Sequence, residues 1–189
     1  MEKNRTRILA ECGIMAAMAT LLSYIPIFEM PQGGSITLCS MVPLVVVSFR
    51  RGVKWGLLTG TVNGFIQMVL GFKNVLYATT IPAIIGCILL DYILAYTVIG
   101  ASCVFGKGIS NFSVRVAVGV VTTGLLRYLC SFLSGILIWG GYAPEGTPVW
   151  IYSMTYNASY MVPEIILTAV ASVLLLSMLK KRDPSSITG

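Results

Sequence analysis

The stretch from Arg127 to Glu164, RYLCSFLSGILIWGGYAPEGTPVWIYSMTYNASYMVPE, decides the fold prediction for the whole chain. Two apolar runs flank a Gly- and Pro-containing turn, which predicts the end of one membrane-spanning helix, a short loop and the start of the next helix. The stretch also contains Arg127, Trp139, Tyr142, Trp150, Tyr152, Tyr156, Asn157, Tyr160 and Glu164. Aromatic faces combined with a few hydrogen-bonding and charged groups indicate a pocket for a flat, polar small molecule.

An aromatic belt at the membrane surface, where Trp and Tyr anchor helix ends, is the alternative interpretation of this stretch. A belt accounts for Trp139, Tyr142 and Trp150. It does not account for Arg127, Asn157 and Glu164, which lie deeper along the two predicted helices.

The composition of the chain is that of an integral membrane protein. Its 189 residues are 56% hydrophobic and only 11% charged, and the mean hydropathy is +0.85. Soluble domains carry about 25% charged residues. Because a transmembrane helix needs about 20 mostly apolar residues, residues 1–189 are predicted to form one all-α domain of six spans. The predicted spans are residues 8–25, 37–49, 53–70, 81–105, 114–139 and 149–179.

The distribution of basic residues predicts the orientation of these spans. All but two of the 13 Lys and Arg residues fall on the side of the N-terminus, the exceptions being Lys73 and Arg127. Positive residues are enriched in cytoplasmic loops, so both termini are predicted to be cytoplasmic in a multi-pass protein of the bacterial cell membrane. The loops at 27–36, 71–80 and 140–148 then face outward, and the first is predicted from its Pro and Gly to be a turn-rich loop.

Several function classes are disfavoured by what the sequence lacks. The net charge of +6 does not indicate nucleic-acid binding, because the basic residues are spread over span ends rather than gathered in one patch. There is no His, and the five Cys are scattered singly, so neither a metal site nor a disulfide is predicted. No nucleotide-binding loop, catalytic motif or cofactor motif is present. Any uphill transport would therefore be powered by a partner or an ion gradient.

Four ionisable residues fall within the predicted spans, namely Glu11, Asp91, Arg127 and Glu164. A charge at the bilayer centre costs at least about 2.5–3.5 kcal/mol, so such residues usually face a partner, a cavity or a ligand. Glu11 lies near a span end and is expected to reach water. Arg127 is expected either to form an ion pair with Asp91 or Glu164, or to line the pocket. Asp91, in mid-span and followed by Tyr92, suits a cationic ligand.

Helical spacing predicts which side chains share a wall of the pocket. Arg127, Ser131 and Gly135 are four residues apart and lie on one sector of their helix. Gly135 is expected to let a ring lie against the backbone. On the last span, Tyr152, Tyr156 and Asn157 occupy successive turns that face the same general direction, and the Asn amide offers both a donor and an acceptor to a heterocycle.

Small residues predict close helix contacts. Gly13 and Ala17 form a small-xxx-small pair on the first span, whose partner is either another helix of this chain or a second subunit. Glycines at 52, 56, 60 and 64 mark one stripe of the third span and also favour tight packing.

Five motifs in this sequence resemble those of the ThiT family, the thiamine-binding S-components of energy-coupling factor transporters. They are MPQGGSITL (30–38), SFRRG (48–52), LLDYILAY (89–96), SGILIWGGYAPEG (134–146) and YSMTYNASYMVPE (152–164). The resemblance covers nearly the whole chain. It implies a six-helix membrane protein that binds thiamine at its outer side and associates with a transmembrane coupling subunit and two cytoplasmic ATPases.

The resemblance also implies roles for individual residues. Trp139 would stack on the ligand rings, Tyr152 and Asn157 would bond its polar edges, and Asp91 would complement its positive charge. The remaining matched wall positions are Tyr92, Arg127, Ser131 and Gly135. Gly13–Ala17 matches the family's helix-contact motif for the coupling subunit. Some members have Glu for Asp91, Lys for Arg127 and His for Ser131, and the loop carrying Tyr77 matches poorly.

Three other functions remain open from the sequence. The ligand of an S-component of this kind is alternatively a pyrimidine precursor of thiamine or another ring vitamin. A small intramembrane enzyme is disfavoured by the lack of a nucleophile–base pair. A structural scaffold would not need Asp91 and Arg127 at membrane depth.

Overall fold

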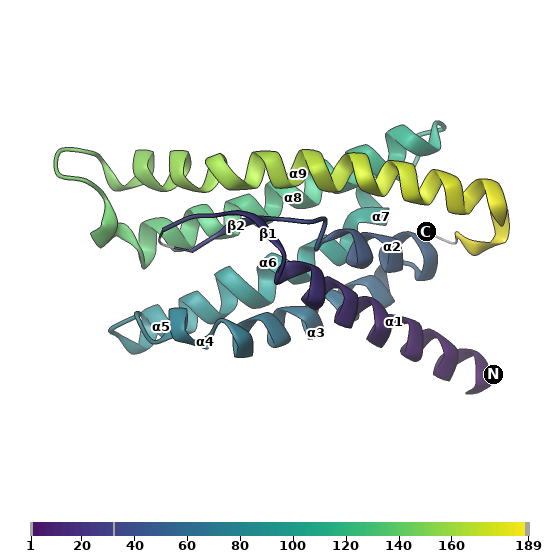
Figure 1. Cartoon of the computed structure of the whole chain (residues 1–189), viewed down its shortest axis with the longest axis horizontal. Helices are drawn as coiled ribbons and strands as arrows, with labels where there is room; N and C mark the ends of the chain where they lie inside the picture. The colour runs from purple at the N-terminus through teal and green to yellow at the C-terminus, as the bar shows by residue number, and fades with distance from the viewer. Residues whose placement is uncertain (1, 32, 188–189) are drawn as a thin grey trace.

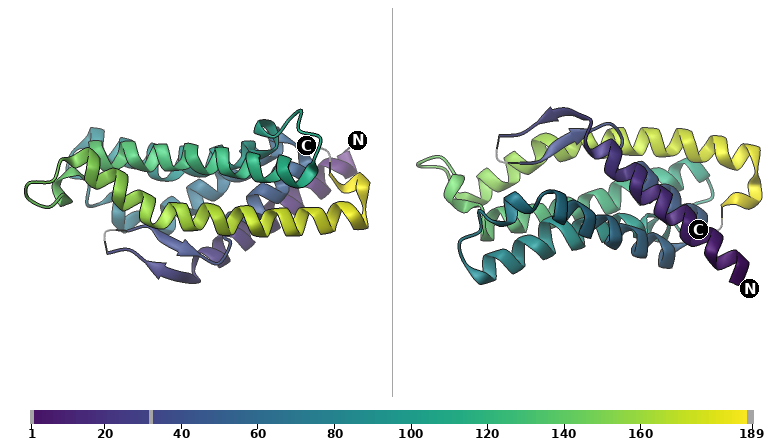
Figure 2. Two further views of the ribbon diagram at one scale, coloured as in Figure 1. Left: turned by 90° about the horizontal axis from the view of Figure 1, so that it is seen from above. Right: turned by 60° about the horizontal axis from the view of Figure 1, so that its bottom comes forward.

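Long helices lie side by side along an elongated bundle (Figure 1). The computed structural model describes residues 2–31 and 33–187. The long helices are α1 (Glu2–Ser23), α3 (Val53–Leu70), α8 (Phe112–Leu137) and α9 (Val149–Arg182). Both chain ends lie at one end of the bundle and the turn between α8 and α9 lies at the other, as Figure 2 also shows.

Four helical segments of the described chain are long and apolar enough to cross a membrane, which makes the protein a multi-pass membrane protein. They are Arg5–Ser23, Ile81–Phe105, Phe112–Leu137 and Val149–Arg182. The ten-residue α2 and the 18-residue α3 are not among them. Six spans and two cytoplasmic termini therefore stay predictions.

The segment Ile81–Phe105 is continuous but not uniformly α-helical. It consists of α5 (Ile81–Cys87), the π-helix η1 (Ile88–Leu94), α6 (Ala95–Thr97), the 3₁₀-helix η2 (Val98–Ala101) and α7 (Ser102–Phe105). π-helical turns are rare in proteins, and those that do occur are frequently found at functional sites. The π-helix contains Asp91 and Tyr92, two of the predicted binding residues.

The prediction of an all-α fold is wrong at one place, because a β-hairpin follows α1. Strands β1 (Pro26–Glu29) and β2 (Ser35–Thr37) pair antiparallel, with Phe28 opposite Ile36. Gly33 and Gly34 in the connection both have φ of +90°, a conformation that glycine adopts without steric cost. The Pro and Gly residues of this segment correctly indicate a turn, but the flanking extended residues pair with each other.

Helix α2 (Val42–Arg51) begins five residues after the start of the predicted span 37–49. Pro43 lies in its first turn, where the missing N–H of proline costs no helical hydrogen bond. Cys39, just before the helix, has φ of +59°, which interrupts any helical path from Thr37. At 1.5 Å per residue, ten residues rise only about 15 Å.

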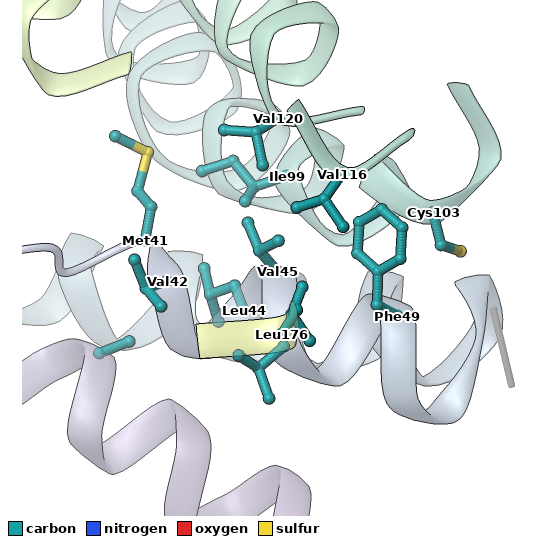
Figure 3. Close-up of a cluster of buried hydrophobic side chains, with 12 residues drawn as sticks. Met41, Val42, Leu44, Val45, Phe49, Ile99, Cys103, Val116, Val120 and Leu176 are labelled. Atoms are coloured by element: carbon teal, nitrogen blue, oxygen red, sulfur yellow. The ribbon is translucent and has the colours of Figure 1, made fainter. Parts of the chain in front are cut away.

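Helix α2 instead forms the centre of the bundle. Its Leu44 and Phe49 are fully buried. In the core cluster drawn in Figure 3 they lie with Ile99 of η2, Val116 of α8 and Leu176 of α9. The ends of the bundle are completed by α4 (Phe72–Val75) and by the 3₁₀ turns η3 (Gly140–Tyr142) and η4 (Pro184–Ser186).

The glycine stripe of α3 packs as predicted, except at Gly52, which precedes the helix. A Cβ placed on Gly56 would lie 2.2 Å from the carbonyl oxygen of Gly100, so only glycine permits this approach of α3 to η2. Glu11, which was expected to reach water, is partly exposed and in addition forms ion pairs. Its carboxylate lies 2.7 Å from Nη1 of Arg50 and also pairs with the guanidinium of Arg51.

Candidate binding cavity

A polar cavity of about 570 Å³ lies between the β-hairpin, η1, α8 and α9. Lys73, Tyr77 and Tyr142 border it, so it lies toward the end of the bundle opposite the chain termini (Figure 1). Its wall contains all eight predicted binding residues, namely Asp91, Tyr92, Arg127, Ser131, Gly135, Trp139, Tyr152 and Asn157. Residues from three helices, η1, α8 and α9, and from the turn after α8 are thus brought to one site. Their contact with a ligand stays a prediction.

Asp91 is held in a fixed orientation by two donors, one in the last turn of α8 and one just beyond its C-terminus. Ser134 Oγ donates to Asp91 Oδ2 over 2.6 Å, and the indole Nε1 of Trp139 donates to the same oxygen over 3.2 Å. Neither hydrogen bond uses Oδ1. The cavity wall therefore presents an oriented carboxylate beside an indole ring, an arrangement suited to a cation.

Arg127 does not form the ion pair that was one of its two expected roles. Among the residues that the structure describes, no carboxylate lies within ion-pair distance of its guanidinium. The guanidinium carbon lies 4.5 Å from the centre of the Tyr96 ring, and Nη1 donates to Met41 Sδ over 2.7 Å. Arg127 thus lines the cavity and is positioned by an aromatic face and a thioether.

The aromatic residues at and near the turn between α8 and α9 differ in whether they line the cavity. Trp139 and Tyr142 line the cavity, and their ring centroids are 6.1 Å apart. Trp150 is 52% exposed and lies outside the cavity wall. The belt interpretation therefore stays open for Trp150, whereas Trp139 and Tyr142 are part of the cavity wall.

Three tyrosines of α9 form a ladder along another wall of the cavity. The ring centroids of Tyr152 and Tyr156 are 5.5 Å apart, and those of Tyr156 and Tyr160 are 6.2 Å apart. The hydroxyl of Tyr156 donates to the carbonyl of Gly33 over 2.9 Å, so the ladder also supports the turn of the hairpin.

The amide of Asn157 is already engaged within the protein. Its Nδ2 donates to the Ser153 carbonyl over 2.8 Å, and its Oδ1 accepts from the Tyr160 hydroxyl over 2.7 Å. A ligand that used Asn157 would have to share or replace one of these bonds. As the structure stands, Asn157 orients Tyr160 toward the cavity.

Gly135 has a structural role besides the one expected. A Cβ at this position would lie 2.1 Å from Ser153 Oγ, so the glycine makes room for α9, and it also lines the cavity. Ser153 Oγ in turn donates to the carbonyl of Phe132 over 2.8 Å. The pair α8–α9 is thereby held close together where the cavity wall forms.

Gly13 and Ala17 lie on the outer face of α1. Both are exposed, and a Cβ on Gly13 would meet no atom within 4 Å. Neighbouring Ala16 and Ala19 are buried and face the bundle. Of the two partners considered for the small-residue pair, packing against another described helix of this chain is therefore not what the structure shows.

Sequence reasoning did not assign several residues of the site. They are Thr37, Met41, Tyr96, Ser134 and the anchoring role of Glu164. Tyr96 lies in α6, directly after the π-helix that contains Asp91. Within the described chain, no group of three or more His, Cys, Asp or Glu side chains is placed to hold a metal ion.

The fold and the cavity together define the protein as a multi-pass helical membrane protein with an internal, aromatic-lined small-molecule site. The chain belongs to the thiamine transporter protein family (Thia_YuaJ), whose model matches residues 9–183.

Two curated relatives and one solved structure support this assignment. Thiamine transporter ThiT of Bacillus subtilis (strain 168) is 40% identical over 178 residues, which cover 88% of each chain. Thiamine transporter ThiT of Lacticaseibacillus paracasei is 27% identical over 186 residues, covering 90% of this chain and 87% of the relative. A solved structure of ThiT from Listeria monocytogenes superposes with a TM-score of 0.70 at 26% identity, covering 97% of this chain and 98% of that chain.

Proposed function

We propose that this protein is the thiamine-binding membrane subunit of a vitamin uptake transporter and takes thiamine from the extracellular side. The observation that carries the proposal is the carboxylate of Asp91, held by Ser134 and Trp139 in the wall of an aromatic cavity. Membership of the thiamine transporter family supports the same ligand.

The chemistry of thiamine matches the groups in the cavity. Its thiazolium ring carries a permanent positive charge, which Asp91 complements at short range in a site of low dielectric constant. The rings of Trp139 and Tyr142 offer stacking and cation–π contacts of about 0.5–2 kcal/mol. The aminopyrimidine is flat and polar at its edge, and the hydroxyl of Tyr152 is a predicted partner for that edge.

Delivery across the membrane is proposed to require an energy-coupling factor module, composed of a transmembrane coupling subunit and two cytoplasmic ATPases. No nucleotide-binding loop occurs in this sequence, so the energy for uptake has to come from elsewhere. The exposed small-residue pair Gly13–Ala17 is the proposed contact for the coupling subunit, because small residues let helix backbones approach closely. The proposed location is the bacterial cytoplasmic membrane.

The decisive test is the identity of the bound compound. Detergent-extracted protein should release thiamine on denaturation, detected by mass spectrometry, and ligand-free protein should bind added thiamine in a calorimeter. A neutral aminopyrimidine without the thiazolium serves as the matched competitor. If that compound co-purifies, or binds as tightly as thiamine, the protein is a transporter subunit for the pyrimidine precursor instead.

A further inference from the structure

We propose that Glu164 is a positioning residue of the thiamine site, whose carboxylate anchors the β-hairpin and the corner before α2 against the cavity. The inference rests on the proposed function for its ligand. Glu164 is buried in α9 and has no part in the ligand contacts proposed for Asp91, Trp139 and Tyr152.

Both oxygens of the Glu164 carboxylate are bound by one residue of the hairpin. The backbone N–H of Thr37 donates to Oε2 over 2.7 Å, and the Thr37 hydroxyl donates to Oε1 over 2.6 Å. The Glu164 side chain is buried, with 3% of the residue exposed. Thr37 and Glu164 are 127 residues apart in sequence, so this contact joins the end of β2 to the middle of α9.

The corner that Glu164 holds is conformationally unfavourable. Cys39, two residues after Thr37, has φ of +59°, a region that residues with a side chain rarely adopt. Such conformations persist only where surrounding contacts hold them. Thr37 Oγ1 lies 2.6 Å from Ser40 Oγ, so the carboxylate fixes the chain on both sides of Cys39.

Two parts of the cavity wall depend on this corner. On one side the hairpin contributes Gly33, Gly34 and Thr37 to the wall. On the other side, Met41 follows Ser40 directly, and its sulfur accepts the hydrogen bond from Arg127 Nη1. Movement of the corner would therefore displace the hairpin and release Arg127 together.

A direct role as a second counter-charge for the cationic ligand is the competing explanation, and paired substitutions separate the two. Glu164→Gln removes the charge but keeps the anchor, because the amide oxygen accepts from the Thr37 N–H and the amide NH₂ donates to the Thr37 hydroxyl. Glu164→Met keeps the length of the side chain but removes both bonds. Glu145→Met, in the exposed loop between α8 and α9, is the matched control.

Thiamine affinity and dissociation rate are measured by calorimetry and stopped-flow fluorescence in the full chain. Glu164→Gln should bind within about threefold of wild type, whereas Glu164→Met should lose about tenfold or more, mainly through faster dissociation. In parallel, the alkylation rate of Cys39 is followed by peptide mass spectrometry, with the half-buried Cys130 of α8 as internal reference. Glu164→Met should accelerate Cys39 labelling by about tenfold and leave Cys130 unchanged.

If Glu164→Gln and Glu164→Met lose the same affinity and Cys39 labelling is unchanged, Glu164 acts as a direct counter-charge for the ligand and the anchoring role is rejected. Unchanged affinity and labelling in Glu164→Met would overturn the proposal. If Glu164→Met does not fold, thiamine affinity and the alkylation rate of Cys39 are measured instead in Thr37→Val, which removes only the hydroxyl. Failure of the wild type to bind thiamine would refute the proposed function, whereas Cys39 labelling tests the anchor without any ligand.

Discussion

The indole nitrogen of Trp139 donates a 3.2 Å hydrogen bond to Oδ2 of Asp91. Trp139 lies just beyond the C-terminus of α8, and Asp91 lies within the π-helix η1, so the bond joins two different segments of the bundle at the cavity. The same contact orients the carboxylate and places an aromatic ring beside it. Both features are needed to bind a flat cation.

Replacement of Asp91 by Asn should weaken thiamine binding by about tenfold or more, because a hydrogen bond or contact to a charged group contributes about 1.5–3 kcal/mol. The amide is nearly isosteric and still accepts from Ser134 and Trp139 through its oxygen. Calorimetry with thiamine and with the neutral aminopyrimidine checks the prediction. Only thiamine should lose affinity, and equal affinities of the variant and the wild type for thiamine would contradict cation recognition.

Trp139 should report ligand binding through its fluorescence. The protein has three Trp residues, of which Trp139 alone lines the cavity. Thiamine should quench the wild-type emission, and the quenching should largely vanish in Trp139→Phe. Because Phe keeps a ring but loses the N–H donor, its affinity should lie between those of wild type and Trp139→Ala, which should lose about tenfold or more. Undiminished quenching in Trp139→Phe would place the ligand elsewhere.

The orientation in the membrane is tested by labelling from outside the cell. In a cysteine-free background, Thr147→Cys should react with an impermeant thiol reagent in intact cells, because positive-inside counting places residues 140–148 outside. Ser185→Cys, near the opposite end of the bundle, should react only after the cells are opened. Labelling of Ser185→Cys but not of Thr147→Cys in intact cells would invert the topology.

Larger side chains on the exposed face of α1 should abolish thiamine uptake without changing thiamine binding. Gly13→Leu and Ala17→Leu place bulk where nothing packs within the described chain, so isolated protein should keep its thiamine affinity and stability. Uptake by cells should be abolished, because the added bulk keeps the coupling subunit at a distance. Ala16→Leu is the matched control on the buried face and should destabilise the isolated protein itself. Normal uptake in both outer-face variants would exclude this face as the coupling contact.

The close approach of α3 to η2 should not tolerate a single added methyl group. Gly56→Ala should lower stability in detergent by about 1–3 kcal/mol, because the new Cβ would lie 2.2 Å from the Gly100 carbonyl oxygen unless the segments move apart. Gly13→Ala, also in a helix but with open space around it, should raise stability by about 0.5–1 kcal/mol. Chemical denaturation followed by circular dichroism distinguishes the two.

The hairpin and the π-helix show why part of the site was not predictable from sequence. The Pro and Gly residues of 27–36 indicate a turn, but strand pairing depends on what the flanking residues meet in space. Because η1 is a π-helix, its side chains share a face at a longer spacing than in an α-helix. No local sequence pattern predicts where a π-helix forms. The contacts of Arg127 with Tyr96 and of Ser134 with Asp91 likewise join segments that are distant in sequence.

Composition and hydropathy by themselves determined that the chain is a helical membrane protein, and the charged residues within its predicted spans indicated a pocket, whose wall contains Asp91, Arg127 and Glu164. These conclusions hold because lipid penalises unpaired charge wherever it occurs along a span. Only the tertiary structure decided that Arg127 lies over Tyr96 rather than pairing with a carboxylate, that Gly135 accommodates Ser153, and that Glu164 binds Thr37. Such partners are set by which segments pack together, and the distances between residues far apart in sequence are absent from any local pattern.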